Sequence, residues 1–366
     1  MIQRNPTGLG KPQRRRVPTV RNRDHHVRIY RTLLGQPPAL QTLSGAYLMA
    51  LVPGNLAFLW FGVWRQSLQA MAIVRPALIA AAVANVFNAV ANWALVFGNL
   101  GLPALGVRGS AIATSASRWL LFAVLLVLSW PLLGEHLRQL FSRAALRWRS
   151  FLQLLRLGVP ISIQVSVEFY MFMIVALMMG NLGSEALAAH QIAVNVASLA
   201  FMVPMGIGAA AATRVGNAIG RSDRPGAERA ASVSLALGGG VMVVFAACFA
   251  LFPQPLARLY TDELGVVALA ATFLPIAALF QVFDGTQVVA AGILRGTADT
   301  RIPATIAFFG FWLIGLPLAW WLTFRADFGP RGLWLGLTAG LATVAVLLVL
   351  RIVQRFRQPI AALVEE

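Results

Sequence analysis

The stretch VVALAATFLPIAALFQVFDGTQVVAA, residues 266–291, indicates the fold class, because Asp284 is its single charged residue. A helix needs roughly 20 mostly apolar residues to cross a bilayer, and this stretch is too long for a strand or an ordinary core helix. Nine apolar runs follow one another along the chain, at 40–63, 76–98, 110–133, 155–180, 186–212, 230–252, 266–291, 303–323 and 332–353. The sequence therefore predicts an all-α polytopic membrane protein with about nine transmembrane helices.

The overall composition excludes a soluble protein. Of the 366 residues, 58% are hydrophobic and 12% are charged, and the mean hydropathy is +0.72. Soluble domains have about 25% charged residues, so this chain lacks the charge to cover a water-facing surface. The chain also lacks a phosphate-binding loop motif, and its single cysteine, Cys248, excludes an internal disulfide and a cysteine-based metal site. We therefore expect no enzyme activity and no cofactor.

The net charge of +17 comes mainly from arginines in short loops between the apolar runs. This is the pattern of membrane topology and not of nucleic-acid binding. One side of the membrane receives most of the arginines: Arg65, Arg75, Arg138, Arg143, Arg147, Arg149, Arg214, Arg221, Arg224, Arg229, Arg295, Arg301, Arg355 and Arg357. The other side receives only Arg108, Arg258, Arg325 and Arg331. The positive-inside rule then predicts a cytoplasmic C-terminus.

An internal repeat conflicts with the number of spans. Residues 64–114 and 294–340 have the same order of features, and the distance from Pro76 to Gly101 (25 residues) matches that from Pro303 to Gly329 (26 residues). The second copy belongs to a group of six spans at the end of the chain, whereas the first copy belongs to a group of only three spans. Nine spans and an inside C-terminus would also place the arginine-rich residues 1–39 outside, against the positive-inside rule. Both observations predict that three further helices belong before the first copy.

Two acids, Glu168 and Asp284, lie well inside predicted spans. An ionised carboxylate near the bilayer centre costs about 2.5–3.5 kcal/mol, so such a residue usually faces a cavity, pairs with a cation or is functional. No lysine can pair with either acid, and Arg118, near the start of another predicted span, is the one alternative partner that we consider. A proton, a sodium ion or a cationic solute could each neutralise them. The alternative is a permanently protonated acid hydrogen-bonded between helices.

Polar and adaptable side chains accompany these acids at helical spacing. Gln164 precedes Glu168 by one turn, and Gln281 and Gln287 flank Asp284 on the same helix face. Gln191, Asn195 and Ser198 form a stripe on the 186–212 helix, and methionines such as Met171 and Met202 could form an adaptable wall for varied ligands. We predict one wet cavity that contains these residues, although the methionines equally fit ordinary helix packing.

The chain resembles the multidrug and toxic compound extrusion (MATE) family of antiporters over residues 33 to 353. The resemblance rests on the order of LRLGVPISIQVSVEF at 155–169, LAAHQIAVN at 187–195, MVPMGIG at 202–208, TRVGNAIG at 213–220 and GILRGTADTRIP at 292–303, with NAVANW at 88–93 and LGVRGSAIAT at 105–114. It implies two six-helix bundles, of which this chain has an incomplete version. It also implies export of small organic cations against inward proton or sodium flow. The arginine-rich composition indicates a prokaryotic source, so we expect an inner-membrane protein, and we expect it to be a monomer in contact with lipid.

The resemblance also implies roles for single residues. Glu168 and Asp284 match the family's two acids of the second lobe, where a proton or Na⁺ would bind, and Asn88 and Asn92 match polar residues of a first-lobe site. Phe280 stands where the family often has a tyrosine one turn before the second acid, and losing that oxygen favours protons over sodium. The first-helix acid that much of the family uses has no counterpart here.

The predicted domain organisation follows from the spans. The segments are a basic N-terminal tail that we expect to be disordered (1–39), a partial first lobe (40–133), a cytoplasmic linker (134–154), a second lobe (155–353) and a cytoplasmic C-terminal tail (354–366). Two alternatives to the exporter remain open. One is a lipid-linked oligosaccharide flippase of related architecture, which would need a cationic cavity, and the other is a truncated membrane protein that transports nothing.

Overall fold

The computed structural model describes residues 38–140 and 148–358, and no strand occurs in these two ranges. The chain divides into two compact units. Unit 1 holds the described residues up to Leu68 and Ile73–Leu132, and unit 2 holds Gln69–Ala72 and the described residues from Leu133 onward. Residues 1–37 of the predicted N-terminal tail and most of the predicted C-terminal tail lie outside the described residues.

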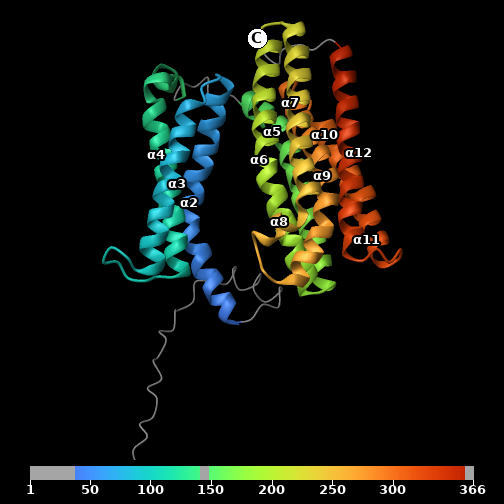
Figure 1. The fold of residues 1–366 in the computed structure, drawn as a ribbon. Helices are drawn as coiled ribbons and strands as arrows, with labels where there is room; N and C mark the ends of the chain where they lie inside the picture. The colour runs from blue at the N-terminus through green and yellow to red at the C-terminus, as the bar shows by residue number, and fades with distance from the viewer. Residues whose placement is uncertain (1–37, 141–147, 359–366) are drawn as a thin grey trace, which may run out of the picture. The chain divides into compact units, whose positions relative to one another are not determined.

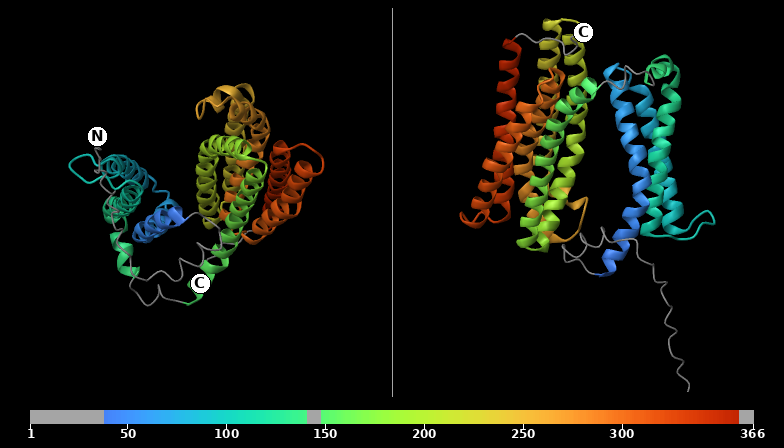
Figure 2. Two further views of the ribbon diagram at one scale, coloured as in Figure 1. Left: turned by 90° about the horizontal axis from the view of Figure 1, so that it is seen from below. Right: turned by 180° about the vertical axis from the view of Figure 1, so that it is seen from behind.

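Each unit is a helix bundle, and within each unit the helices run side by side (Figures 1 and 2). Unit 1 consists of α3 (Arg75–Phe97) and most of α2 (Pro38–Ala70) and α4 (Val107–Leu140), whose last residues fall in unit 2. Unit 2 contains α5 (Trp148–Asn181), α6 (Ser184–Gly220), α7 (Arg224–Leu251), α8 (Pro253–Arg258), α9 (Leu264–Gly296), α10 (Arg301–Phe308), the π-helical η1 (Phe309–Gly315), α11 (Leu316–Phe324) and α12 (Pro330–Arg357). The stretch α10–η1–α11 forms one continuous span.

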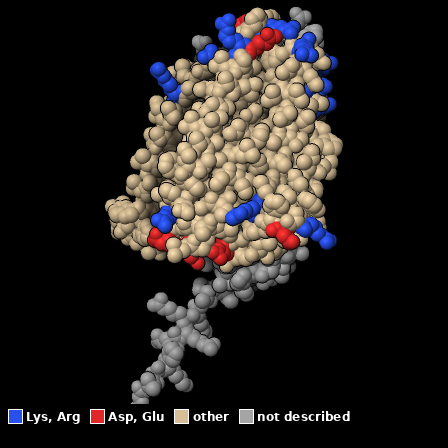
Figure 3. Space-filling view, turned by 45° about the vertical axis from the view of Figure 1, so that its right-hand side comes forward, with Lys and Arg blue, Asp and Glu red and all other residues tan. Residues whose placement is uncertain are grey.

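Nine helices of the described residues are long and apolar enough to cross a membrane, which confirms the predicted number of spans. The space-filling view agrees, because charged side chains on this face gather at the two ends and leave a broad uncharged band between them (Figure 3). Most helices extend beyond their predicted bounds. The predicted linker 134–154 is partly helical, since α4 continues to Leu140 and α5 begins at Trp148. The extra turns contain polar residues that an apolar-run criterion leaves out.

The helix α9 is the centre of unit 2 and packs against α6, α7, α8 and α12. Glycines allow the close approach. A Cβ on Gly208 of α6 would lie 2.9 Å from the backbone oxygen of Val288, and a Cβ on Gly292 of α9 would collide with the backbone of Gly208. On the opposite side, a Cβ on Gly238 of α7 would lie 2.7 Å from a Val289 methyl group. Small residues at such contacts are typical of membrane helices, whose association depends on close van der Waals packing.

The π-helical segment η1 interrupts the span from Arg301 to Phe324 where it meets α12. Leu316 donates its backbone N–H to the carbonyl of Phe311, five residues earlier, and Pro317 has no N–H to continue the regular ladder. Here a Cβ on Gly340 of α12 would lie 2.7 Å from the Cα of Gly315. The local widening of the helix therefore coincides with a glycine-to-glycine contact.

An ion pair links α12 to the turn between α9 and α10. Arg351 Nε donates to Asp299 Oδ2 at 2.7 Å, and the two side chains are 23% and 9% exposed. The other ion pair of the described residues, Arg224–Glu228 on α7, is about half exposed on both sides. A nearly buried carboxylate depends strongly on its partner, whereas exposed pairs contribute little.

We therefore expect Arg351→Gln to lower the free energy of unfolding by about 2–3 kcal/mol, because it leaves the Asp299 carboxylate without its cation. The matched control, Glu228→Gln, breaks the exposed pair and should change stability by at most about 0.5 kcal/mol. Both variants can be measured by unfolding in mixed micelles titrated with SDS. Equal effects of the two substitutions would contradict the structural role of the Arg351–Asp299 pair.

Candidate functional site

The two intramembrane acids come together from different helices. Glu168 lies in the middle of α5, and Asp284 lies on α9 and is 6% exposed. The two carboxylates are close enough to interact electrostatically. Because like charges repel and burial penalises both, the pair favours binding of a proton or another cation. The acids are 116 positions apart in the sequence, and the helical periodicity around each one does not predict that they come together.

The glutamines on either side of Asp284 complete a set of oxygen acceptors. The amide of Gln287 donates a hydrogen bond to Glu168, while its buried Oε1 has no partner among the described residues. Gln281 donates Nε2 to the carbonyl of Ala197 on α6 at 2.9 Å, and its buried Oε1 is also without a described partner. Buried acceptors are normally satisfied, so these two free oxygens on the helix of Asp284 form an environment that suits a cation.

Aromatic rings close the site one turn away from Asp284. Phe280 is 2% exposed and packs edge-on against Phe172 of α5 and Trp334 of α12, with ring centroids 6.0 and 5.8 Å apart. Met171 is 1% exposed and belongs to the same hydrophobic core. Phe280 and Met171 are therefore packing residues in this structure, and neither offers an oxygen to an ion.

A nearby cation escaped the sequence prediction. Arg295, which we assigned to a loop, lies in the last turn of α9 and interacts electrostatically with Glu168. Its Nε donates to the carbonyl of Ala291 at 3.2 Å, so the side chain folds back along its own helix toward Asp284. Arg295 follows Asp284 by 11 residues, which places it within about 20° of the same helix face. This spacing could have identified Arg295 as a neighbour of the acids from the sequence.

The other predicted cavity residues of unit 2 differ from one another in burial. Gln164 is buried on α5 one turn before Glu168, as the spacing predicted. Gln191 and Asn195 are exposed on α6, where Asn195 Nδ2 donates to the carbonyl of Gln191 at 2.9 Å, and Met202 is 56% exposed. The buried face of α6 is the one that packs on α9. The α6 stripe is therefore exposed whereas Asp284 is buried, and a common cavity for these residues and the two acids stays a prediction.

Of the two predicted first-lobe residues, Asn88 lines a separate cavity of unit 1, and Asn92 lies one helical turn further along α3. This cavity has a volume of about 290 Å³ and is lined by residues of α2, α3 and α4, including Asn88 and Arg118. Asn92 Nδ2 donates to the carbonyl of Asn88 at 2.9 Å, and Asn88 Nδ2 donates to Ser117 Oγ at 3.0 Å. Arg118 donates to Asn55 Oδ1 and lies over the ring of Phe58, 5.2 Å from its centroid. Its guanidinium is thus engaged within unit 1.

The site offers carboxylates and amide oxygens rather than a dense metal centre. Among residues 38–140 and 148–358, no group of three or more His, Cys, Asp and Glu side chains is placed to hold a metal ion. A sodium ion at Glu168 and Asp284 would therefore need the amide oxygens as ligands, whereas a proton needs only one carboxylate oxygen.

Comparisons with known proteins identify the family of the chain. The sequence model of the MatE family matches residues 160–321. The chain is 42% identical over 335 residues to "Probable multidrug resistance protein NorM" of Mesorhizobium japonicum, covering 88% of this chain and 71% of that protein. It is also 42% identical over 323 residues to "Multidrug resistance protein NorM" of Burkholderia vietnamiensis, covering 86% of this chain and 69% of the relative.

Solved structures show the same fold at lower sequence identity. The eukaryotic MATE transporter AtDTX14 has a TM-score of 0.77 at 24% identity, covering 91% of this chain and 75% of that one. A crystal structure of a MATE protein in the bent conformation has a TM-score of 0.79 at 18% identity, covering 90% and 72%. Together with the two intramembrane acids and the nine spans, these matches establish that the chain belongs to the MATE family of multi-pass membrane transporters and is not an enzyme.

Proposed function

We propose that the protein exports small organic cations across the bacterial inner membrane, coupled to inward flow of protons, with Glu168 and Asp284 as the coupling site. The observation behind this proposal is the meeting of two carboxylates from α5 and α9 beside free amide oxygens in the interior of unit 2. Such a site is neutralised by one cation at a time, so its occupancy can alternate. The NorM relatives, which are named as multidrug resistance proteins, support the substrate class.

Protons are the proposed ion because of Phe280. At this position, one turn from Asp284, the buried side chain packs against Phe172 and Trp334 in the hydrophobic core and supplies no oxygen. A sodium ion needs several oxygen ligands, whereas a proton needs a single carboxylate. The orientation that we propose, with a cytoplasmic C-terminus, follows from the positive-inside rule, and we propose that the protein acts as a monomer in contact with lipid.

The test is transport by the full chain in reconstituted vesicles. We expect an imposed proton gradient to drive accumulation of a fluorescent organic cation, and an imposed sodium gradient alone to leave it at the rate of protein-free vesicles. Sodium-driven transport would contradict proton coupling, and no transport under either gradient would favour the non-transporting alternative. The flippase alternative predicts binding of anionic lipid-linked sugars in place of cationic dyes, and the acids inside unit 2 do not suit such a ligand.

A further inference from the structure

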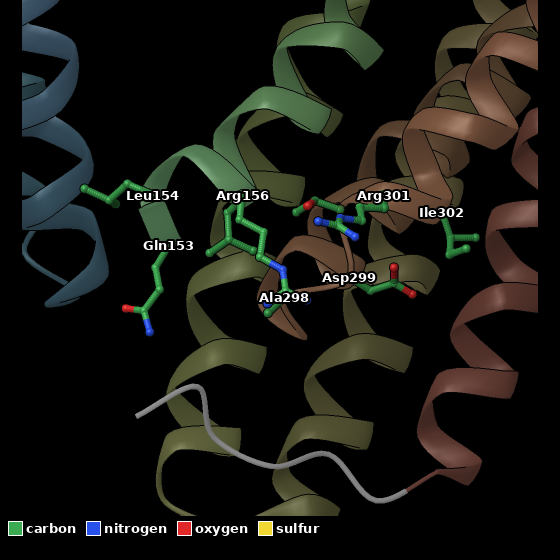
Figure 4. Close-up of a pocket in the computed structure, with 9 residues that line it drawn as sticks. Gln153, Leu154, Arg156, Ala298, Asp299, Arg301 and Ile302 are labelled. Atoms are coloured by element: carbon green, nitrogen blue, oxygen red, sulfur yellow. The ribbon is translucent and has the colours of Figure 1, made fainter. Parts of the chain in front are cut away.

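A second cavity lies away from the acid pair, at the arginine-rich end of unit 2. It has a volume of about 670 Å³ and lies between the first turns of α5 and the turn that joins α9 to α10 (Figure 4). Arg156, which lines it, precedes Glu168 by 12 residues, or about 18 Å along α5. The cavity is therefore distinct from the candidate coupling site, and its lining differs in charge.

The cavity has an uncompensated positive charge. Arg156 from α5 and Arg301 from the start of α10 both line it, and Figure 4 shows their side chains in the space between α5 and the turn. Within the part of the chain that the structure describes, neither guanidinium has an ion-pair or hydrogen-bond partner. Asp299 is the one acid of the lining, and Arg351 neutralises it at 2.7 Å. Two free guanidinium groups therefore remain.

Guanidinium groups recognise phosphate well, because their planar N–H donors match pairs of phosphate oxygens. The remainder of the lining suggests what the phosphate is attached to. Leu154, Leu157 and Ile302 give the cavity an apolar wall, beside the amide of Gln153. A free inorganic phosphate would gain nothing from these leucine and isoleucine side chains, whereas the glycerol and first acyl carbons of a lipid would.

The start of α5 lies where lipid headgroups are expected. Trp148 and Phe151 are both exposed and stack on each other with ring centroids 5.2 Å apart, next to the 71% exposed Leu154. Exposed aromatic residues at the end of a membrane helix are typical of the membrane interface, where lipid phosphates lie. Basic pockets between membrane helices at this depth are known to suit anionic headgroups.

We propose that this cavity binds a phosphate group, with an anionic phospholipid as its source, and that Arg156 and Arg301 hold it. The lipid would bridge α5 to the turn between α9 and α10. These two regions are already linked, because α5 packs against α10. Binding should therefore stabilise unit 2. The proposal does not depend on transport activity or on the coupling ion, so its failure and the failure of the proposed function can be told apart.

The test uses the full chain in phosphatidylcholine nanodiscs with and without phosphatidylglycerol. Native mass spectrometry counts the retained phosphatidylglycerol, and thermal unfolding reports stabilisation. We expect the double variant Arg156→Gln/Arg301→Gln to bind phosphatidylglycerol about tenfold more weakly or worse, because it loses two charge-assisted contacts. Since both side chains are exposed, this variant should fold. The variant Arg156→Lys/Arg301→Lys keeps the charge but loses the forked guanidinium donors. Its affinity for phosphatidylglycerol should therefore lie between those of the glutamine variant and the wild type.

The matched control is Arg221→Gln/Arg229→Gln, which removes the same charge from exposed positions at the end of α6 and near the start of α7 in the same unit. It should retain phosphatidylglycerol like the wild type. Equal loss in the control and in the cavity variant would overturn the site, as would unchanged binding by the cavity variant. Stabilisation by millimolar inorganic phosphate that matches phosphatidylglycerol would overturn the lipid as the source.

Discussion

Asp284→Asn is expected to reduce gradient-driven export to the rate of protein-free vesicles. Asparagine keeps the size of the side chain, but it cannot change its charge when a cation arrives or leaves. Asp284 is 6% exposed and its electrostatic neighbour is another acid, Glu168, so a binding equilibrium at this position depends on the ionisable group itself. The measurement is accumulation of a fluorescent cation in vesicles under a proton gradient, and we expect Glu168→Gln to have the same effect.

A matched control separates coupling from a general loss of charge. Glu228→Gln removes an acid from the exposed face of α7 and should leave the transport rate unchanged. Binding of the fluorescent cation to purified Asp284→Asn, measured without any gradient, shows whether the variant is folded and still recognises the solute. Wild-type transport rates in both Asp284→Asn and Glu168→Gln would refute their role in coupling. Loss of transport in Glu228→Gln as well would mean that the assay reports stability and not coupling.

The fold and the family were predictable from the sequence, because they depend on local patterns. The span at 266–291 needs only its own length and composition, and the structure confirms it within α9. Helix ends were less predictable. The helix α5 begins at Trp148, seven residues before the predicted start, because its first turns combine Arg149, Gln153 and Arg156 with exposed apolar side chains that suit an interface. A criterion based on apolar runs does not detect such turns.

The candidate site was only partly predictable, because it depends on how each helix is rotated against its neighbours. The acids and the two flanking glutamines were found from rarity and spacing, and their coupling role stays a prediction. The same reasoning placed Gln191 and Asn195 in one cavity with them, yet α6 turns its alanine-rich face toward α9 and leaves both residues exposed. The segment η1 could not be foreseen either, since it occurs where Gly315 meets α12.

The packing of α6 on α9 leads to the second large effect, which concerns stability. Gly292→Ala is expected to lower the free energy of unfolding by about 3 kcal/mol, the upper end of the usual cost of overpacking. Its new methyl group would meet the backbone oxygen of Gly208, and a backbone atom cannot move aside as a flexible side chain can. The two helices would have to separate, and α9 holds Asp284 and Gln287 in place.

Gly206→Ala is the matched control for this substitution. Gly206 lies on α6 two residues from Gly208, but it faces outward, and a Cβ there would meet nothing within 4 Å. Alanine lowers the conformational entropy of the unfolded chain, so the control should be neutral or up to about 1 kcal/mol more stable. Unfolding in mixed micelles titrated with SDS measures both variants. A Gly292→Ala protein as stable as Gly206→Ala would mean that α6 and α9 do not approach as closely as the structure has them, and the acceptor set around Asp284 would then lose its geometric basis.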